Sequence, residues 1–177
     1  VDNVKIMKHY FATKRMEGLS DKTLRTYKYH IKAFLDQMNV DIRNTDTNMV
    51  RFYLADLGTH AGNSFVDDAR RIINTFFTFC EDEEYIKKNP VKRINRVKIN
   101  KTMETPYSDI EVEKLRDSCT TKRETALIDF LFATGCRREE ITKVKLSDID
   151  FIERSVLIHG KGGKDRVVYM SARCIKH

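Results

Sequence analysis

The sequence has little of what marks secreted scaffolds, zinc modules and membrane proteins. Its four cysteines, Cys80, Cys119, Cys136 and Cys174, lie far apart and form no CxxC pair, which argues against a zinc site or a disulfide framework. We therefore expect free thiols packed in a core, in a reducing cytosol. No apolar run approaches the ~18 residues that a membrane-spanning helix needs. The sequence opens without a charged-then-apolar leader and does not start with a methionine, so we expect a trimmed chain that is not secreted.

The composition is that of a globular protein with an excess of positive charge. With 177 residues, 41% of them apolar and 33% charged, the chain is long enough for one ordinary domain or two small ones. This balance argues against collagen-like, low-complexity and disordered proteins. Lys and Arg total 33 against 26 Asp and Glu, giving a net charge of +7 and a pI near 9.2. Polyanions are therefore the first partners to consider.

Proline is scarce, and the two prolines, Pro90 and Pro106, bracket a segment of unusual charge. Residues 87–101, KKNPVKRINRVKINK, carry seven basic side chains and no acidic one, shortly after an acidic run at residues 81–84. A sharp reversal of charge around a proline is typical of a domain boundary. The reversal predicts a first domain, a basic linker and a second domain over residues 1–97, 98–105 and 106–177.

Upstream of the basic segment, apolar residues recur at helical spacing in four stretches. The second stretch begins at Ser20 and Asp21, which resemble a helix cap, and the fourth follows Gly62 and carries Phe76 and Phe77. No strand-like alternation intervenes. We therefore predict a compact, all-helical bundle of about four helices for the first domain.

The second domain mixes helix and strand. Ser108 and Glu111 have the spacing of a capping box, which starts one helix. Residues 121–135, TKRETALIDFLFATG, predict a second helix that is apolar on most sides and belongs in a core. Residues 155–159 and 166–170, SVLIH and RVVYM, predict two strands joined by a glycine-rich turn. The predicted fold is therefore mainly α with a small β-hairpin or sheet.

Two local patterns stand out in the second domain. In ATGCRREEI, residues 133–141, a helix ends at a glycine and Arg137 opens the next helical turn, with Glu140 three residues on. In HGKGGKDR, residues 159–166, Lys161 occupies the tip of the hairpin. Taken alone, the first is typical of a solvated ion pair on a helix and the second of a simple hairpin turn. The second also fails the P-loop pattern, since no Ser or Thr follows either lysine.

Together, in this order and with Lys161 twenty-four positions after Arg137, the two patterns resemble those of the tyrosine recombinase family, also called phage-type integrases. Xer-type recombinases and mobile-element integrases are the most similar members. Cys136 departs from the pattern, since an aliphatic residue is more usual there. The residues that match the family's TGxRxxE and GKGxKxR patterns are Thr134, Gly135, Arg137, Glu140, Gly160, Lys161, Gly162, Lys164 and Arg166.

The resemblance extends over nearly the whole chain. Ser20, Thr23 and Tyr27 are similar to the SxxTxxxY of the family's helical core-binding domain, and residues 70–90 resemble the last helix and exit of that domain. The resemblance therefore implies an N-terminal, SAM-like core-binding bundle followed by the N-terminal half of a mixed α/β catalytic domain.

For activity, the resemblance implies cleavage and rejoining of DNA strands through a 3′-phosphotyrosine intermediate, without a metal or nucleotide cofactor. Arg137 would stabilise the negative charge that develops on the phosphate, since a guanidinium fork binds phosphate through two hydrogen bonds. Lys161 would protonate the departing 5′ oxygen as a general acid. Glu140 would orient Arg137 from the same helical face.

The expected partner is a duplex DNA recombination site, which other protomers would share as a tetramer on two sites. No membrane partner is expected, and the expected location is the cytoplasm of a prokaryote, near the nucleoid. Hydroxyl and basic side chains at helix starts and in the exit segment are natural phosphate ligands. The candidates for DNA binding are Lys22, Thr23, Tyr27, Arg70, Arg71, Lys87, Lys88, Lys92, Arg93, Lys164 and Arg166.

Some of these residues also fit a simpler interpretation. His159 is expected to pack against the hairpin rather than to catalyse. Adjacent like charges are typical of solvated helix faces, and this applies to the pairs Arg70 and Arg71, Asp67 and Asp68, and Glu139 and Glu140.

The remaining catalytic residues of the family are missing from this sequence. Its HxxR motif, a further His or Trp, and the nucleophilic tyrosine lie downstream of the lysine hairpin. Tyr169 lies too close to the hairpin to be the nucleophile, and His177 has no arginine after it. We therefore expect a truncated chain that binds duplex DNA without cleaving it. The alternatives are a DNA-binding module or regulator that has lost the chemistry, and a helical protein-interaction domain with incidental basic charge.

Overall fold

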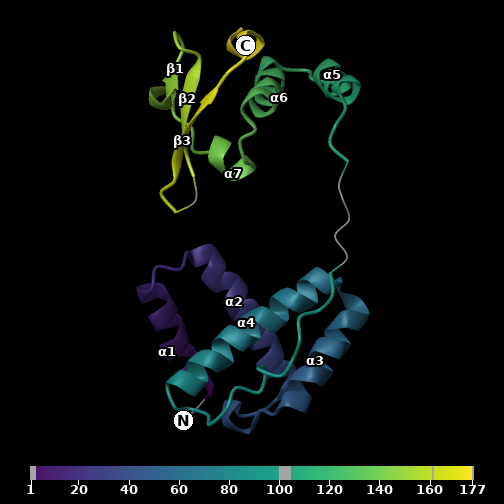
Figure 1. The fold of residues 1–177 in the computed structure, drawn as a ribbon, viewed down its shortest axis with the longest axis vertical. Coiled ribbons are helices and arrows are strands. Elements are labelled where there is room, and N and C mark those ends of the chain that lie inside the picture. The colour runs from purple at the N-terminus through teal and green to yellow at the C-terminus, as the bar shows by residue number, and fades with distance from the viewer. Residues whose placement is uncertain (1–2, 100–104, 161, 177) are drawn as a thin grey trace. The chain divides into compact units, whose positions relative to one another are not determined.

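The computed structural model in Figure 1 describes residues 3–99, 105–160 and 162–176. The chain divides into two units, Val1–Thr102 and Met103–His177, and each is described by itself. In its described part the first unit is helical, and the second combines helices with a small sheet. The predicted fold class is therefore confirmed. Within the described ranges, none of the helices has the length and apolar character needed to span a membrane.

Four α-helices form the described part of the first unit, as the apolar periodicity predicts. Ser20 caps the second of them, since its hydroxyl oxygen accepts the backbone N–H of Thr23 at 3.2 Å. A short 3-10 helix, η1 (Ile42–Asn44), precedes the third. The four are α1 (Asn3–Met16), α2 (Asp21–Met38), α3 (Thr47–His60) and α4 (Asn63–Asp82).

Aromatic side chains of α4 and its neighbours build the core of the first unit. Phe76 and Phe77 are fully buried, and Tyr10 of α1 meets Phe76 edge to face, with 5.1 Å between ring centroids. Phe34 of α2 meets Tyr53 of α3 in the same way, also at 5.1 Å. Such pairs add to the stability that burial provides. Helix α4 is therefore the element around which the other three helices pack.

The basic segment after α4 packs back onto the bundle. Val91 is 1% exposed, and its backbone N–H donates to the side chain of the buried Asn89 at 2.8 Å. Further along, the backbone N–H of Val97 donates to Asp67 of α4 at 3.1 Å. The first part of this segment is thus held by the bundle, whereas residues 100–104 of the predicted linker lie outside the described residues.

The second unit combines short helices with an antiparallel sheet. The predicted capping box is confirmed, because Ser108 and Glu111 each accept the other's backbone N–H. The strands β1 (Ile149–Asp150), β2 (Ser155–His159) and β3 (Asp165–Tyr169) pair in that order, so both predicted strands are confirmed and β1 is added. Its helices are α5 (Asp109–Asp117), α6 (Lys122–Thr134), α7 (Arg138–Ile141), η2 (Leu146–Asp148) and α8 (Ala172–Ile175).

The core of the second unit is small. Val156 and Ile158 of β2 are fully buried and pack with Met170, Cys136 and Cys174. The expected free thiols are confirmed, and three of the four, Cys80 included, are buried.

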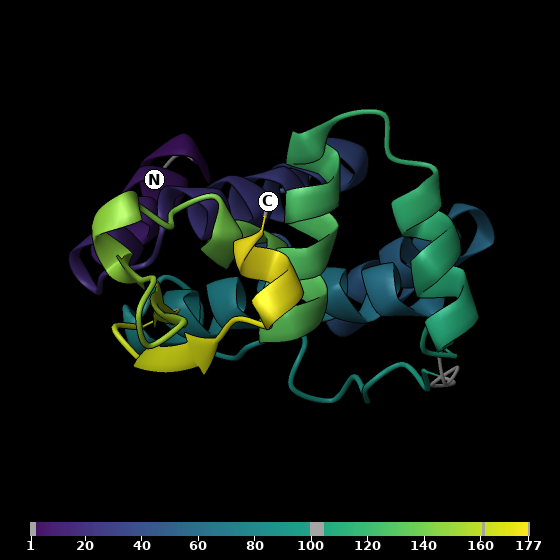
Figure 2. The same cartoon turned by 90° about the horizontal axis from the view of Figure 1, so that it is seen from above.

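The prediction that residues 121–135 form a core helix is wrong in one respect. The helix forms as α6, joined to α5 by a short loop (Figure 2), but Leu127 is 46% and Phe132 58% exposed. The buried residue of α6 is Asp129, to which Arg116 of α5 donates a hydrogen bond at 2.6 Å. The apolar pattern overstates burial because the covered face of α6 includes a charged residue that a neighbouring arginine neutralises.

Candidate functional site

The site is built on the turn between α6 and α7. Helix α6 ends at Gly135, whose left-handed backbone (φ 59°) an L side chain adopts only with strain. The chain then leaves the helix axis, and Arg137 lies in extended backbone just before α7. The Glu140 carboxylate accepts the backbone N–H of Arg137 at 2.9 Å. This bond caps α7 and fixes the backbone from which the Arg137 side chain extends.

Glu140 joins two arginines that are distant in the sequence. Arg137 donates from Nη1 to Oε1 of Glu140 at 2.9 Å. Arg166 of β3 donates from Nη1 to Oε1 at 3.1 Å and from Nη2 to Oε2 at 2.7 Å. The Glu140 side chain is only 6% exposed, whereas that of Arg137 is 78% exposed. Glu140 is thus not part of a solvated face, and we call the three residues the Arg–Glu–Arg cluster.

The two arginines keep Glu140 ionised. Hydrogen bonds from Arg166, followed by the backbone N–H of Arg137, hold the pKa of Glu140 well below its usual range, although burial acts in the opposite direction. In return, the Glu140 carboxylate raises the pKa of Arg166. An ionised carboxylate only accepts hydrogen bonds, so Glu140 can anchor a guanidinium but cannot donate a proton near neutral pH.

The β2–β3 hairpin carries the second motif. Arg166 is paired with Ile158 across the two strands, and the backbone N–H of Gly160 donates to the Lys164 carbonyl at 3.0 Å, which closes the turn. A Cβ at position 160 would lie 2.4 Å from that carbonyl oxygen, so the turn requires glycine there. Lys164 is exposed on the turn. Lys161, the expected general acid, lies outside the described residues.

In the first unit, two of the expected DNA contacts lie together. Tyr27 of α2 lies near Arg71 of α4, and Arg71 donates to Asp68 at 3.1 Å. Asp68 raises the pKa of Arg71, and Tyr27 adds to this effect, so the half-exposed Arg71 is a permanent cation. Lys22 and Thr23 lie in the first turn of α2, where Lys22 is exposed. These positions suit contacts with a polyanion that runs past the first turns of α2 and the middle of α4.

Arg70 does not reach this surface. Its side chain is 12% exposed, and Nε donates to Oδ1 of Asp67 at 2.7 Å. Asp67 is itself buried and also lies 3.7 Å from Nε of Arg96, in the segment after α4. The structure therefore corrects two expectations, that Arg70 faces phosphate and that Asp67 belongs to a solvated face. Both residues instead tie α4 to the basic segment.

The basic segment presents part of its charge to solvent. Lys87, Lys88 and Arg93 are exposed. Lys92 is also exposed, but its ammonium group lies 3.1 Å from a carboxylate oxygen of Glu81. Of the four expected phosphate ligands in this segment, Lys92 is thus partly neutralised by Glu81, whereas Lys87, Lys88 and Arg93 are exposed without that pairing.

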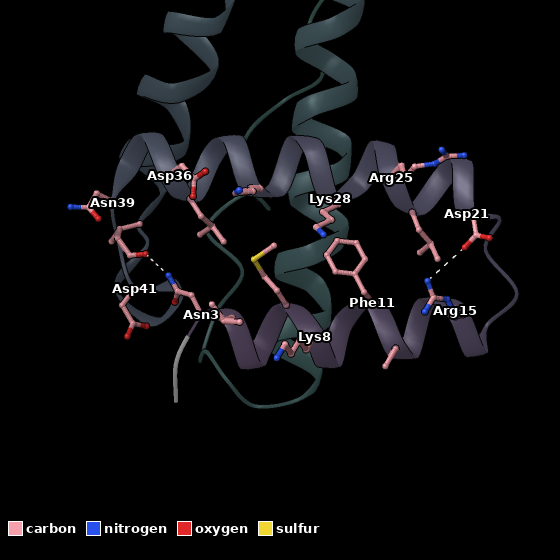
Figure 3. Close-up of a pocket in the computed structure, with 17 residues that line it drawn as sticks. Asn3, Lys8, Phe11, Arg15, Asp21, Arg25, Lys28, Asp36, Asn39 and Asp41 are labelled. Carbon is pink, nitrogen blue, oxygen red and sulfur yellow. Dashed lines mark hydrogen bonds and ion pairs between the residues drawn. The ribbon is translucent and has the colours of Figure 1, made fainter.

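A groove between α1 and α2, of about 1400 Å³, is the feature that sequence reasoning missed (Figure 3). Phe11 of α1 and Lys28 of α2 extend into the space between the two helices. Arg25 and Lys32 add to the basic rim, and their spacing from Lys28, three and four residues, was the signal in the sequence. The groove contains none of the Arg–Glu–Arg cluster, and Asp21, Asp36 and Asp41 line it together with the basic residues, so it forms a separate charged surface of the first unit.

Comparison with known proteins finds a family match for each half of the chain. Residues 8–84 match the phage integrase N-terminal SAM-like domain, and residues 92–176 match the phage integrase family. Tyrosine recombinase XerC of Thermodesulfovibrio yellowstonii is 27% identical over 163 residues, covering 88% of this chain and 54% of the relative. XerC of Staphylococcus aureus is 28% identical over 181 residues, covering 96% and 60%. The chain thus spans little more than half the length of these relatives.

Solved structures share the fold. A lambda integrase dimer bound to a COC′ core site superposes with a TM-score of 0.82 at 16% identity, over 99% of this chain and 65% of that one. The integrase of transposon Tn1549, in complex with circular intermediate DNA, gives a TM-score of 0.67 at 16% identity, over 97% and 62%. With one family domain matched over residues 8–84 and another over residues 92–176, the chain belongs to the phage integrase family, the tyrosine recombinases.

Proposed function

We propose that this chain is part of a site-specific recombinase that cleaves and rejoins DNA through a 3′-phosphotyrosine. It would supply the DNA-binding domain and the first half of the catalytic domain. The observation that carries the proposal is the exposed guanidinium of Arg137, held by a buried, ionised Glu140 in a tyrosine recombinase chain. Lambda integrase and the Tn1549 integrase, which share the fold, are both described as bound to DNA.

Arg137 is suited to bind the scissile phosphate. Its Nη1 is engaged with Glu140, and the rest of the exposed guanidinium is open to an anion. When a tyrosine oxygen attacks the phosphate, negative charge grows on the phosphoryl oxygens, and a preoriented guanidinium stabilises that charge without reorganisation. A lysine would supply the charge without the planar, two-pronged geometry.

Lys161 is the proposed general acid. A 5′ oxygen leaves DNA as a poor leaving group unless it receives a proton, which a lysine ammonium can donate. The motif places Lys161 in a glycine-rich turn whose neck is fixed by the pairing of β2 with β3. No metal or nucleotide cofactor enters this chemistry.

The proposed partner is a duplex recombination site, bound together with other protomers. In the first unit, the proposed contacts with the phosphate backbone are Tyr27 and the half-exposed Arg71, alongside Lys22 and Thr23 of α2. Lys87, Lys88, Lys92 and Arg93 supply further positive charge after α4. Such contacts position a protein on DNA without reading its sequence.

Salt dependence of DNA binding tests this proposal. If the chain neutralises about four to six phosphates, the logarithm of its affinity for duplex DNA falls with the logarithm of salt at about −0.9 per contact. Replacing Lys87, Lys88, Lys92 and Arg93 with Gln is expected to weaken binding equally for unrelated DNA sequences, measured by fluorescence anisotropy. Unchanged affinity of this variant at low salt would count against a DNA-binding role of the basic segment.

We further propose that the 177 residues alone do not cleave DNA. They include neither an HxxR motif nor a tyrosine at the distance from the lysine hairpin that the family requires. A suicide DNA substrate, which traps a covalent protein–DNA adduct, is expected to give none with this chain. Trapping of an adduct would overturn the assignment of the missing nucleophile.

A further inference from the structure

Arg166 is committed within the protein rather than presented to DNA. The sequence motif marks it as a DNA contact, yet both of its terminal nitrogens donate to Glu140, one to each carboxylate oxygen, at 3.1 and 2.7 Å. This two-pronged pair is the strongest geometry that a guanidinium and a carboxylate adopt. Its side chain is about half as exposed as that of Arg137, at 38% against 78%.

The anchor of Arg166 is rigid. It lies on β3 opposite Ile158, which is fully buried, and both strands are fixed by antiparallel pairing. Glu140 lies 26 residues earlier, at the start of α7. The Glu140–Arg166 pair therefore joins β3, next to the turn of the lysine hairpin, to the α6–α7 turn that bears Arg137.

Charge arithmetic shows what this pair does for Arg137. The cluster contains two guanidiniums and one ionised carboxylate, so one positive charge remains in excess. The Arg166 guanidinium bonds both oxygens of the buried Glu140, whereas the Arg137 guanidinium bonds only one of them, so the excess charge is assigned to the exposed Arg137. If Arg166 were neutral, the same carboxylate would compensate Arg137 instead, and an approaching phosphate would meet an ion pair of no net charge.

We propose that Arg166 is a positioning residue that acts through Glu140: it satisfies the carboxylate so that Arg137 keeps its charge and orientation for a DNA phosphate. This inference rests on the proposed function, since it takes a phosphate as the ligand of Arg137. It assigns no contact with DNA to Arg166 itself.

Neutral substitutions separate this role from a direct phosphate contact. Affinity of the full chain for a short fluorescent duplex is measured across a salt series. Arg166→Gln is expected to make the salt slope shallower by about 0.9, the equivalent of one phosphate contact, as Arg137→Gln does. The double variant Glu140→Gln/Arg166→Gln removes the carboxylate as well, and it is expected to recover the slope because Arg137 regains its charge. Arg123→Gln, an exposed arginine of α6 outside the cluster, is the control for simple loss of charge and is expected to keep the slope.

The double variant decides the question. If it remains as shallow as Arg166→Gln, then Arg166 itself contacts phosphate and the inference is wrong. A wild-type slope in Arg166→Gln would also overturn it. Circular dichroism checks folding, and if Arg166→Gln unfolds the second unit, the double variant still gives the answer because it leaves no uncompensated carboxylate. Absence of any salt dependence in the wild-type chain would instead defeat the proposed function, so the two failures are distinguishable.

Discussion

The two units differ in how much of their packing is apolar and how much depends on buried ion pairs. The first has a large apolar core in which Tyr10, Phe34, Phe76 and Phe77 are almost completely inaccessible to water. The second has only a small apolar cluster around Val156 and Ile158. The first unit also buries a charged pair, Asp67 with Arg70, but beside an extensive apolar core. In the described part of the second unit, the buried Asp129 and Glu140 lie beside a small apolar core, so its fold is expected to depend more on ion pairs.

Among the described residues of the second unit, two carboxylates are buried, and each lies between two arginines. Asp129 of α6 lies 2.6 Å from Arg116 of α5 and 3.6 Å from Arg173 of α8. Glu140 joins Arg137 to Arg166 in the same manner. Removing one partner of such a pair leaves a buried charge uncompensated, so these carboxylates fix one arrangement of the elements rather than adding much net stability. A phosphate-binding arginine needs that kind of fixed arrangement.

Truncating the aromatic core is expected to have the largest effect, and to be confined to the first unit. Phe76→Ala removes a fully buried ring from α4 and is expected to lower the free energy of unfolding by about 3–5 kcal/mol. Hydrogen exchange of the full chain, read by mass spectrometry, reports α4 and α6 separately. Phe52→Ala, at a side chain that is 73% exposed, is the matched control. Equal loss of protection in α6 would contradict the division into two units.

Neutralising Asp129 is expected to destabilise the second unit, as Phe76→Ala destabilises the first. Asp129→Asn leaves Arg116 without its buried counter-ion, and the expected cost is about 3 kcal/mol. Protection is expected to fall in α5, α6 and α8 while α4 is unaffected. Asp117→Asn, at an exposed position of α5, makes the same chemical change without a buried pair and is expected to be neutral. If the two variants behaved alike, charge burial would not hold this unit together.

This contrast also explains which features sequence reasoning could reach. The helices of the first unit follow from apolar periodicity because residues such as Phe76 and Phe77 are buried for the reason that the pattern assumes. Capping boxes such as Ser108 with Glu111 are local and were equally readable. The matched motifs located Arg137, and its family context gave it a role that composition alone could not.

Long-range pairing of charges was not readable. Nothing in the residue types shows that Asp129 is buried, or that Asp67 is buried and bonded to the segment after α4. The bond from Arg166 to Glu140 spans 26 residues, so local spacing gives no hint of it. A charged residue has the same sequence signature whether it faces solvent or a buried partner, and only the tertiary fold distinguishes the two.

Acid is expected to weaken the second unit through Glu140. Because the pKa of Glu140 is lowered in the folded protein, its contribution to stability is complete above the ordinary value of 4.5 and is lost as the pH falls below it. Exchange protection of β3 and α7 is therefore expected to fall with pH in the wild type and to depend less on pH in Glu140→Gln. The exposed neighbour Glu139→Gln provides the control. A parallel acid dependence in Glu140→Gln would show that other carboxylates dominate.

The smallest expected effect is a titration within the aromatic unit itself. His30 of α2 is 3% exposed and packs against Tyr29 and Phe65, with ring centroids 5.2 and 4.9 Å away. Burial lowers the pKa of His30, with Arg71 acting in the same direction and Asp68 opposing it. The unfolded chain therefore takes up the proton more readily, so stability is expected to fall as the pH drops below the ordinary histidine value of 6.5.

Substituting His30 by a ring that cannot be protonated isolates this contribution. In His30→Phe, the loss of α2 and α4 exchange protection between neutral pH and the onset of carboxylate protonation is expected to disappear. His60→Phe, at an exposed position near the end of α3, is expected to keep it. If the wild type shows no such loss, His30 is not titrating in this range. The apolar unit would then be insensitive to mild acid, and the contrast with the charge-dependent unit would be sharper than the burial of His30 suggests.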